Sequence, residues 1–594
     1  MILAIFNREP VFEQPTYVAD MGCGDGIFLA RVHQVVRDKS LRGRMLQNHP
    51  LTLIGVDYNA QALAATARTL KAIPHLLFQG DIGDPESLVG EFKARGIDPG
   101  EVLHIRSFLD HNRPFHAPVH QTGIERRWSL DYSGVYVDEK GGSIPAPALV
   151  QNLVEHLQRW AGIVGKYGLI LLEVHCLPPR MVDLFLDQCE NLQFDACHGF
   201  SRQYLVEADT FLMAAAEAGL FPKPEFFHRY PETLPFSRIT LNWLEKRDYR
   251  LRHAYGGDVP GLVELEAACW PEPLRLLPLE IRRRIECFPE GQFLLELDAE
   301  IVGVLYSQMI ERADSLADIT FEQVSSLHCG QGTVLQLLNV NILPDVQNMG
   351  LGDQLLDFVL SWITLKGGVE KVVGVTRCKD FMHSALPMPE YIRQHNEQGG
   401  LIDPTLHFHT SHGAVIKGLV PRYRPTDADN QGYGVCIEYD LSRHRRAPAT
   451  QSEIHQPAAA DAPSVMETVA TAVRTALGAR REGAYAPNRA LMDMGLDSLD
   501  LLALRVNLGR KLNASLDSTF FFRCSTPDAI TAHFQGKPLL EAARAGGTVP
   551  WATPAKAPEP PHARANREIL PDEADAPTVQ KRTLRTVNVF RWLV

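Results

Sequence analysis

Hydrophobic and polar residues follow three different patterns along the chain. Up to about residue 245, short apolar runs such as LTLIGVD and GLILLEVH alternate with stretches of helical periodicity, which favours an α/β sheet. From about 247 to 445, strands and helices again alternate, and QFLLELDAEIVGVLYSQMI predicts two strands around an Asp-Ala-Glu turn. From 464 to 540, the apolar positions follow helical spacing. The pattern therefore predicts a multidomain chain with α/β, α+β and all-α parts.

Changes in composition mark the boundaries between these parts. APATQSEIHQPAAADAP, at 447–463, is rich in Ala and Pro and has no hydrophobic period, which is typical of a linker. A similar stretch runs from about 545 to 578, and a strand-like run over Ser237–Trp243 gives way to charged residues around Lys246. The predicted divisions are domains at 1–245, 247–445 and 464–540, a linker at 446–463, and a linker and tail at 541–594.

Composition excludes several classes of protein. The 594 residues correspond to about three to five domains at roughly 100–200 residues each, and 45% hydrophobic with 22% charged residues excludes a wholly disordered chain. A net charge of −12 argues against bulk nucleic-acid binding. Ten cysteines without a C-x-x-C pair fit a reducing, cytoplasmic location. No apolar run reaches the ~18 residues of a membrane span, and the start does not have the pattern of a signal peptide.

A glycine-rich turn follows the first predicted strand. TYVADMGCGDGIFLA ends an apolar run at an aspartate, turns at three glycines and begins a helix, an arrangement that lets backbone approach a ligand closely. A second strand ends at Asp57, where a carboxylate can accept hydrogen bonds from a ribose diol, and Asp81 follows a third strand. The series resembles class I S-adenosylmethionine-dependent methyltransferases of Rossmann-like fold over about residues 10–245. The resemblance implies a cofactor site at Asp20, Gly22, Gly24, Gly26, Asp57 and Asp81.

Two features complicate this resemblance. The chain begins almost at the first predicted strand, so the N-terminal lid usual in such enzymes is not expected, and a scaffold that no longer binds cofactor is the alternative. Polar clusters at Asp110-His111, Glu173-x-His175 and HGFSRQY resemble those of metal-dependent methyltransferases in polyketide initiation modules. Imidazole and amide oxygen can bind iron or manganese, and His175 and Gln203 are the expected ligands. The alternative is ordinary polar residues at strand ends.

The second region contains a Q-x-x-G-x-G motif between a predicted strand, VLQLLNVNILP, and an amphipathic helix, DQLLDFVLSWI. Free N–H groups at a helix start, beside glycines, can bind a pyrophosphate. The motif resembles the acetyl-CoA site of GCN5-related N-acetyltransferases (GNAT acyltransferases). That resemblance implies coenzyme A binding at Gln347, Asn348, Met349, Gly350, Leu351 and Gly352.

Four further residues narrow the resemblance to the decarboxylase of curacin-type polyketide synthase loading modules. They are Trp270, Thr376, His409 and Arg424, and the family implies that they line the tunnel where a malonyl thioester loses CO2. Decarboxylation leaves an enolate, which preorganised donors stabilise. We expect His409 and Thr376 to hold the thioester oxygen or the departing carboxylate, with His409 also a candidate proton donor.

Trp270 is expected to exclude water and Arg424 to bind the carboxylate or the carrier's phosphate. Each residue also has an ordinary interpretation: tryptophan as core, threonine as a favoured strand residue, and arginine as surface charge. His407, His409 and His412 form an alternative metal cluster, and His412 is an alternative to His409 as the functional histidine.

The third region resembles acyl carrier proteins of four-helix fold. LMDMGLDSLDLLALRVNLGRKL places Ser498 beside Asp497 at a helix start. The family carries 4′-phosphopantetheine on this serine, attached by a phosphopantetheinyl transferase. An ordinary N-cap serine is the alternative. A tethered thiol raises the effective substrate concentration at a neighbouring domain.

These observations predict a loading protein for polyketide chain initiation. Its substrate is expected to be malonyl-CoA or methylmalonyl-CoA, with methylation by S-adenosylmethionine first if the N-terminal domain is active, and its acyl starter passes to a ketosynthase on another subunit. A non-catalytic carrier scaffold and an amine N-acetyltransferase are the alternatives.

Overall fold

The structure is a computed structural model that forms two compact units, Met1–Gln451 and Ser452–Val594. It describes residues 1–189, 192, 195, 201–397, 399–441, 464–477, 485–496, 498–512 and 520–535. The predicted linkers at 446–463 and 541–594 lie outside the described residues.

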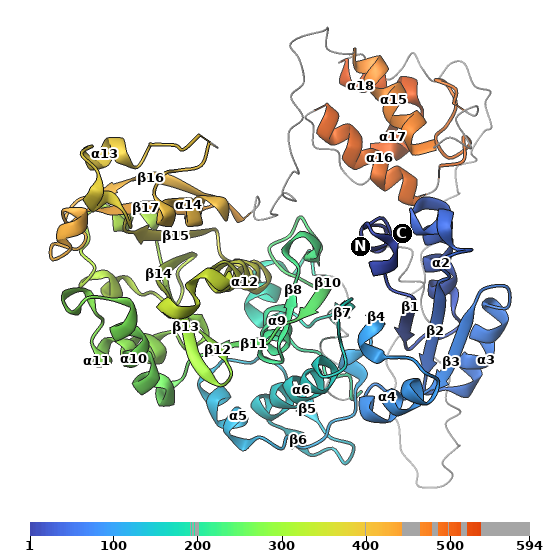
Figure 1. The fold of residues 1–594 in the computed structure, drawn as a ribbon, viewed down its shortest axis with the longest axis horizontal. Coiled ribbons are helices and arrows are strands. Elements are labelled where there is room, and N and C mark those ends of the chain that lie inside the picture. The colour runs from blue at the N-terminus through green and yellow to red at the C-terminus, as the bar shows by residue number, and fades with distance from the viewer. Residues whose placement is uncertain are drawn as a thin grey trace, which may run out of the picture. The chain divides into compact units, whose positions relative to one another are not determined.

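An eight-stranded sheet, in the order β3-β2-β1-β4-β7-β10-β8 with β9 beside β10, organises the first half of unit one (Figure 1). Neighbours from β3 to β7 are parallel, while β10 is antiparallel to β7, β8 and β9. Parallel neighbours require crossover connections, which are helical here. The strands are β1 Tyr17–Met21, β2 Thr52–Asp57, β3 His75–Gln79, β4 Val102–Ser107, β7 Leu169–Val174, β8 Leu220–Pro222, β9 His228–Tyr230 and β10 Ile239–Lys246.

Two helices of this region begin at residues whose side chains cap them. Asn59 accepts from the Gln61 N–H at the start of α3, and Asp84 accepts from the Ser87 N–H at the start of α4, satisfying donors that a helix start leaves free. The helices are α1 Ile2–Phe6, α2 Ile27–Lys39, α3 Ala60–Thr69, α4 Pro85–Ala94, α5 Gln121–Arg126, α6 Ala146–Ala161, α7 Pro179–Leu184 and α9 Ala208–Glu217, with a small hairpin of β5 Tyr136–Val137 and β6 Ser143–Ile144.

A seven-stranded sheet in the order β11-β12-β13-β14-β15-β17-β16 organises the second half. The strand pair expected in the QFLLELDAEIVGVLYSQMI segment is present as β12 and β13, joined through Asp298 and Ala299 at φ 52° and 67°. The strands are β11 Tyr249–His253, β12 Gln292–Leu297, β13 Glu300–Ile310, β14 Val334–Ile342, β15 Lys371–Thr376, β16 Ala414–Val420 and β17 Gly434–Tyr439. The helices are α10 Val259–Cys269, α11 Pro278–Cys287, α12 Leu351–Lys366, α13 Met388–Tyr391 and α14 Pro404–Ser411.

One hydrophobic core joins the two sheets. Helix α9 packs on α12 and β11 (Figure 1), and Ala216 and Phe221 share a cluster with Phe358. At the edge of this contact Lys366 Nζ lies 2.7 Å from Glu290 and 3.9 Å from Asp209. The last strand of the first sheet ends at Lys246 and the second sheet begins at Tyr249, and the two sheets share this core.

Unit two contains four described helices around one core: α15 Val465–Leu477, α16 Ser498–Lys511, α17 Phe520–Arg523 and α18 Pro527–Phe534. Ser464 and Glu467 form a reciprocal cap at the start of α15. Apolar positions at helical spacing meet in the core, which includes Val473, Leu504 and Ile530.

Candidate active site

The GNAT-like sheet opens where β14 and β15 part. The two strands pair in parallel over Val334–Leu337 and Lys371–Gly374, and beyond these residues the pairing stops. On its other side β14 has a bulge, because Ser307 faces Leu337 while Tyr306 faces Asn339, which leaves Leu338 unopposed. A bulge increases local twist and bends the strand. A cavity of about 520 Å3 lies at the unpaired ends of these strands.

Side chains from four separate elements line this cavity. Trp270 follows α10, Thr376 ends β15, His409 lies on α14, and Arg424 lies in the loop after β16. Their convergence depends on strand order, because α10 and α14 are far apart in the chain.

A hydrogen-bonded chain orients the Trp270 ring. The Trp270 Nε1–H donates to Asn341 Oδ1 at 2.9 Å, and Asn341 Nδ2–H donates to Glu266 Oε2 at 2.7 Å. Asn341 and Glu266 are buried, and burial raises the pKa of Glu266. The indole ring is thereby fixed against the cavity wall.

Arg424 is a buried cation without a carboxylate at ion-pair distance in the described part of the chain. Its guanidinium stacks on Phe321 at 3.5 Å and on Trp270 at 4.9 Å, and Nη1–H donates to the Leu274 carbonyl at 3.4 Å. Burial lowers the pKa of Arg424 to about 10, which still leaves it charged at neutral pH. By contrast, Arg377 on the same cavity pairs with both oxygens of Asp427 at 3.0 Å.

His409 is buried and neutral. Its Nδ1 lies 2.6 Å from the Tyr439 hydroxyl, and burial, followed by the nearby His412, lowers the pKa of His409 to about 3. Thr376 is half-buried, and its hydroxyl makes a long 3.4 Å contact with the Arg377 carbonyl. Both side chains therefore offer hydrogen-bonding groups to the cavity without a net charge.

His412 does not line the cavity. Its Nδ1 lies 2.7 Å from the Phe408 carbonyl, and its Nε2 faces Asp353 at 3.4 Å and Asp357 at 3.5 Å on α12. His407 lines a separate, more open groove. No group of three metal-ligating side chains occurs here or elsewhere in the described ranges.

The glycine motif lies between β14 and α12. A short 3-10 turn, Pro344–Met349, leads to Gly350, whose φ of 72° favours glycine. Gln347 Nε2–H donates back to the Ile342 carbonyl at 3.1 Å. Gln347 and Gly352 line the cavity, so the first turn of α12 borders it, while Met349 is exposed.

Sequence reasoning missed the residues that hold this site in place. Asn341, Glu266, Tyr439 and Arg377 were not singled out. Only Asn341 could have been noticed in the sequence, because it is a polar residue within the apolar strand VLQLLNVNILP. The partners of Tyr439 and Arg377 come from distant parts of the chain, so spacing carried no signal for them.

In the methyltransferase-like sheet, the glycine turn folds against the end of β2. The Gly24 N–H donates to Asp57 Oδ2 at 3.0 Å, and a Cβ at Gly24 would meet open space. Burial and the neighbouring Asp57 raise the pKa of Asp20 to about 8. Asp81 is exposed and accepts from the Gly83 N–H at 2.7 Å. Open space therefore borders the turn at Gly24, while the turn itself bonds one carboxylate oxygen of Asp57.

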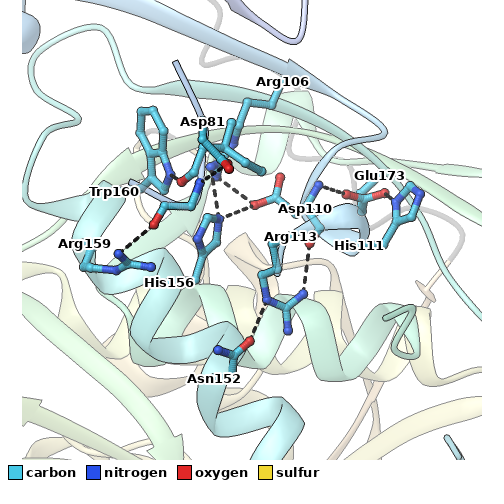
Figure 2. A network of polar contacts seen from close by, with 12 residues as sticks. Asp81, Arg106, Asp110, His111, Arg113, Asn152, His156, Arg159, Trp160 and Glu173 are labelled. Atoms are coloured by element: carbon cyan, nitrogen blue, oxygen red, sulfur yellow. Dashed lines mark hydrogen bonds and ion pairs between the residues drawn. The ribbon is translucent and has the colours of Figure 1, made fainter. Parts of the chain in front are cut away.

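Two of the polar clusters noted in the sequence, at Asp110-His111 and at Glu173, pair with one another (Figure 2). Glu173 accepts from the Asp110 N–H at 2.8 Å and lies 2.6 Å from His111 Nδ1. Arg106 pairs with Asp110 at 3.1 Å, and His156 Nε2 lies 3.2 Å from the same carboxylate oxygen. These groups are buried, and the charges of the two carboxylates are offset by Arg106 and by the neighbouring, equally buried Arg113.

The two expected metal ligands, His175 and Gln203, each contact a hydroxyl group of the protein. His175 Nε2 lies 2.8 Å from the Thr240 hydroxyl, its ring packs edge-on against Phe211, and burial lowers its pKa to about 3. Gln203 Oε1 accepts from the Ser201 hydroxyl at 3.4 Å. His198 lies outside the described residues. Among the described residues, no three His, Cys, Asp or Glu side chains gather as metal ligands, and a metal held by His175 and Gln203 stays a prediction.

Ser498 is the first residue of α16, as the carrier resemblance implies. Asp497 lies outside the described residues. The described cysteines are all free thiols, and none of the described helices has the length and apolarity to cross a membrane.

Comparisons with known proteins match all three parts of the chain. A family profile described as an AprA MT2-like domain matches residues 1–242, and one described as a phosphopantetheine attachment site matches residues 467–534. The loading GNATL domain of CurA from Lyngbya majuscula is 49% identical, with a TM-score of 0.33, over 33% of this chain and 99% of that one. The GphF GNAT-like decarboxylase in complex with isobutyryl-CoA is 41% identical, with a TM-score of 0.31, over 32% and 99%.

A curated relative, a probable hydrolase named YhcX from Bacillus subtilis (strain 168), is 23% identical over 210 residues, which are 34% of this chain. This chain spans 40% of the length of that relative.

Fold and comparisons together define a multidomain protein whose sequence runs from a methyltransferase-like domain through a GNAT-like domain to a phosphopantetheine carrier domain. The chain belongs to the curacin-type loading modules of polyketide synthases.

Proposed function

We propose that residues 247–445 decarboxylate a malonyl or methylmalonyl thioester and that the acyl product is loaded on the phosphopantetheine arm of Ser498. The observation that carries the proposal is Arg424, a buried guanidinium with aromatic rings on it and no carboxylate of its own within ion-pair distance among the described residues. A buried charge of this kind calls for an anionic partner. The free carboxylate of a malonyl group supplies one.

The remaining side chains suit the chemistry that follows. The start of α12 can hold the diphosphate of coenzyme A with its free N–H groups, while the Trp270 ring excludes water from the carboxylate. The bond between the α-carbon and the carboxylate breaks, CO2 leaves, and the electron pair spreads onto the thioester oxygen. Thr376 and His409 stabilise that oxygen as hydrogen-bond donors, each worth about 10²–10³ in rate by analogy with oxyanion holes.

Loading and methylation are the finer parts of the proposal. The carrier presents a phosphopantetheine thiol, which takes the acyl group from coenzyme A or already holds the malonyl group when it is decarboxylated. S-adenosylmethionine, when bound at the Gly22–Gly26 turn, would supply an electrophilic methyl group. Asp57 and Asp20 are the residues of this chain that would hold it. An amine N-acetyltransferase is the alternative function, and it would require an amine site and a general base.

The test is intact-protein mass spectrometry of the phosphopantetheinylated full chain with malonyl-CoA, with and without S-adenosylmethionine. Acetyl on the arm without S-adenosylmethionine supports decarboxylation with loading. An additional methylene that needs S-adenosylmethionine supports methylation. Only malonyl on the arm, or no acyl group when coenzyme A thioester and pre-charged carrier are both supplied, contradicts the decarboxylase. The Ser498→Ala chain, which cannot carry the arm, is the matched control.

A further inference from the structure

Tyr439 lies behind the cavity histidine. Its hydroxyl is 2.6 Å from His409 Nδ1, and its side chain is 2% exposed at the end of β17. His409 borders the cavity whereas Tyr439 does not. The hydrogen bond therefore engages the ring nitrogen on the side away from the cavity and leaves Nε2 for the substrate.

The direction of this hydrogen bond follows from the surroundings of the phenol. His409 is the only hydrogen-bond partner of the Tyr439 hydroxyl among the described residues. If the His409 Nδ1–H donated to the phenol oxygen, the buried O–H would have no acceptor, which costs about 1–3 kcal/mol. If the O–H donates to Nδ1, both groups are satisfied. Burial also raises the pKa of Tyr439 well above its usual range, so the phenol keeps its proton.

The tautomer of His409 follows directly. A neutral imidazole that accepts at Nδ1 carries its proton on Nε2, and burial lowers the pKa of His409 to about 3, which excludes the doubly protonated ring at neutral pH. The nitrogen left for the cavity is then a hydrogen-bond donor and has no free lone pair.

We propose that Tyr439 is a positioning residue that locks His409 as the Nε2–H tautomer, so that His409 donates a hydrogen bond to the thioester oxygen throughout decarboxylation and transfers no proton. This rests on the proposed function. In the balanced step, the C–C bond to the carboxylate breaks, its electron pair forms the enolate, and CO2 leaves. The α-carbon then takes a proton from water, while His409 keeps its own.

Steady-state CO2 release from malonyl-CoA by the full chain tests the lock. Tyr439→Phe should lower kcat about tenfold and change KM less than twofold, because the ring loses its fixed tautomer while the binding groups remain. Tyr306→Phe is the matched control, since Tyr306 is also a buried phenol of this domain and its hydroxyl has no hydrogen-bond partner among the described residues. Its kcat should stay within twofold.

His409→Gln separates a donor from a proton-transfer group. A glutamine amide supplies N–H but neither acid nor base, so its kcat should exceed that of His409→Ala at least tenfold. In the His409→Gln background, Tyr439→Phe should change kcat less than twofold, since no imidazole remains to be locked. Equal rates for the Gln and Ala variants, or a full tenfold effect of Tyr439→Phe in both backgrounds, would overturn the proposal.

Nitrogen-15 NMR of histidine-labelled full chain reads the tautomer without turnover. The pair of signals that disappears in His409→Gln should show Nδ1 as acceptor and Nε2 as protonated, and Tyr439→Phe should shift that pair toward a mixture. Protonated Nδ1 in the unmutated chain overturns the lock. If the chain releases no CO2, the proposed function is contradicted. The NMR result then tests by itself whether Tyr439 fixes the His409 tautomer.

Discussion

At the scale of single residues, environment decides what each functional group can do. Two arginines border the same cavity, but Arg377 is neutralised by Asp427 at 3.0 Å, whereas Arg424 has aromatic rings and a backbone carbonyl as partners. Only the second has charge left to bind an anion. The same reasoning separates His409 at the cavity from His412, which faces the acids of α12.

Arg424→Met should therefore discriminate between thioesters. We expect kcat/KM for malonyl-CoA to fall at least 100-fold, because the substrate carboxylate loses a desolvated charge partner, a change worth several kcal/mol. The Kd of acetyl-CoA, which has no such carboxylate, should stay within about twofold. Calorimetric binding and CO2 release measure the two quantities. An equal loss for both ligands would contradict the assignment of Arg424 to the carboxylate.

Asp20 should make stability depend on pH. The pKa of Asp20 is about 8 in the folded chain against 3.8 as its ordinary value, so between these values the folded state holds a proton that the unfolded state has lost. The free energy of unfolding contributed by this group therefore falls as pH rises from about 4 to 8. Asp20→Asn should flatten that slope, as measured by urea unfolding at pH 5 and pH 8. An unchanged slope would contradict a buried, protonated Asp20.

At the scale of elements, the cavity results from strands that stop pairing and a helix that starts beside them. β14 and β15 pair as far as Leu337 and Gly374, and α12 begins after Gly350 in the left-handed region at φ 72°. The positive φ is what favours glycine at that position. Crowding is not the reason, since a Cβ there would meet no other atom within 4 Å. Gly352, inside the helix, has no such requirement.

Alanine substitutions should separate these two glycines. Gly350→Ala should lower the free energy of unfolding by about 1 kcal/mol, because alanine is strained at positive φ. Gly352→Ala should leave stability unchanged or raise it, since alanine favours helix and its Cβ would lie 3.6 Å from Phe408. Urea unfolding of both variants measures this, and a stable Gly350→Ala would contradict the backbone argument.

At the scale of the whole molecule, the two sheets of unit one share a core through α9. Ala216 is fully buried in a cluster with Leu355, Phe358 and other residues of α12. Parts of a chain that share one buried core tend to unfold in a single cooperative transition. The methyltransferase-like and GNAT-like parts should therefore unfold together although their folds are distinct.

Ala216→Asp should uncouple the two parts. An unpaired carboxylate buried in this contact costs several kcal/mol, so we expect the single calorimetric transition of unit one to split or to shift down by several degrees. Ala65→Asp, at a half-buried position on α3 in the same region, is the control and should leave the transition whole. Two separate transitions in the unmutated chain would contradict the shared core.

Short-range patterns determined much of this protein from the sequence alone. The alternation of apolar runs, the glycine turns at Gly22–Gly26 and Gly350, and the helix that begins at Ser498 all depend on neighbours within a few residues, so they could be predicted. Tertiary structure alone decided how polar groups pair across the chain. Asp110 and His111 bond to Glu173 from a distant segment, and Tyr439 meets His409, because strand order and register bring distant residues together. The spacing of these residues in the sequence does not record such contacts.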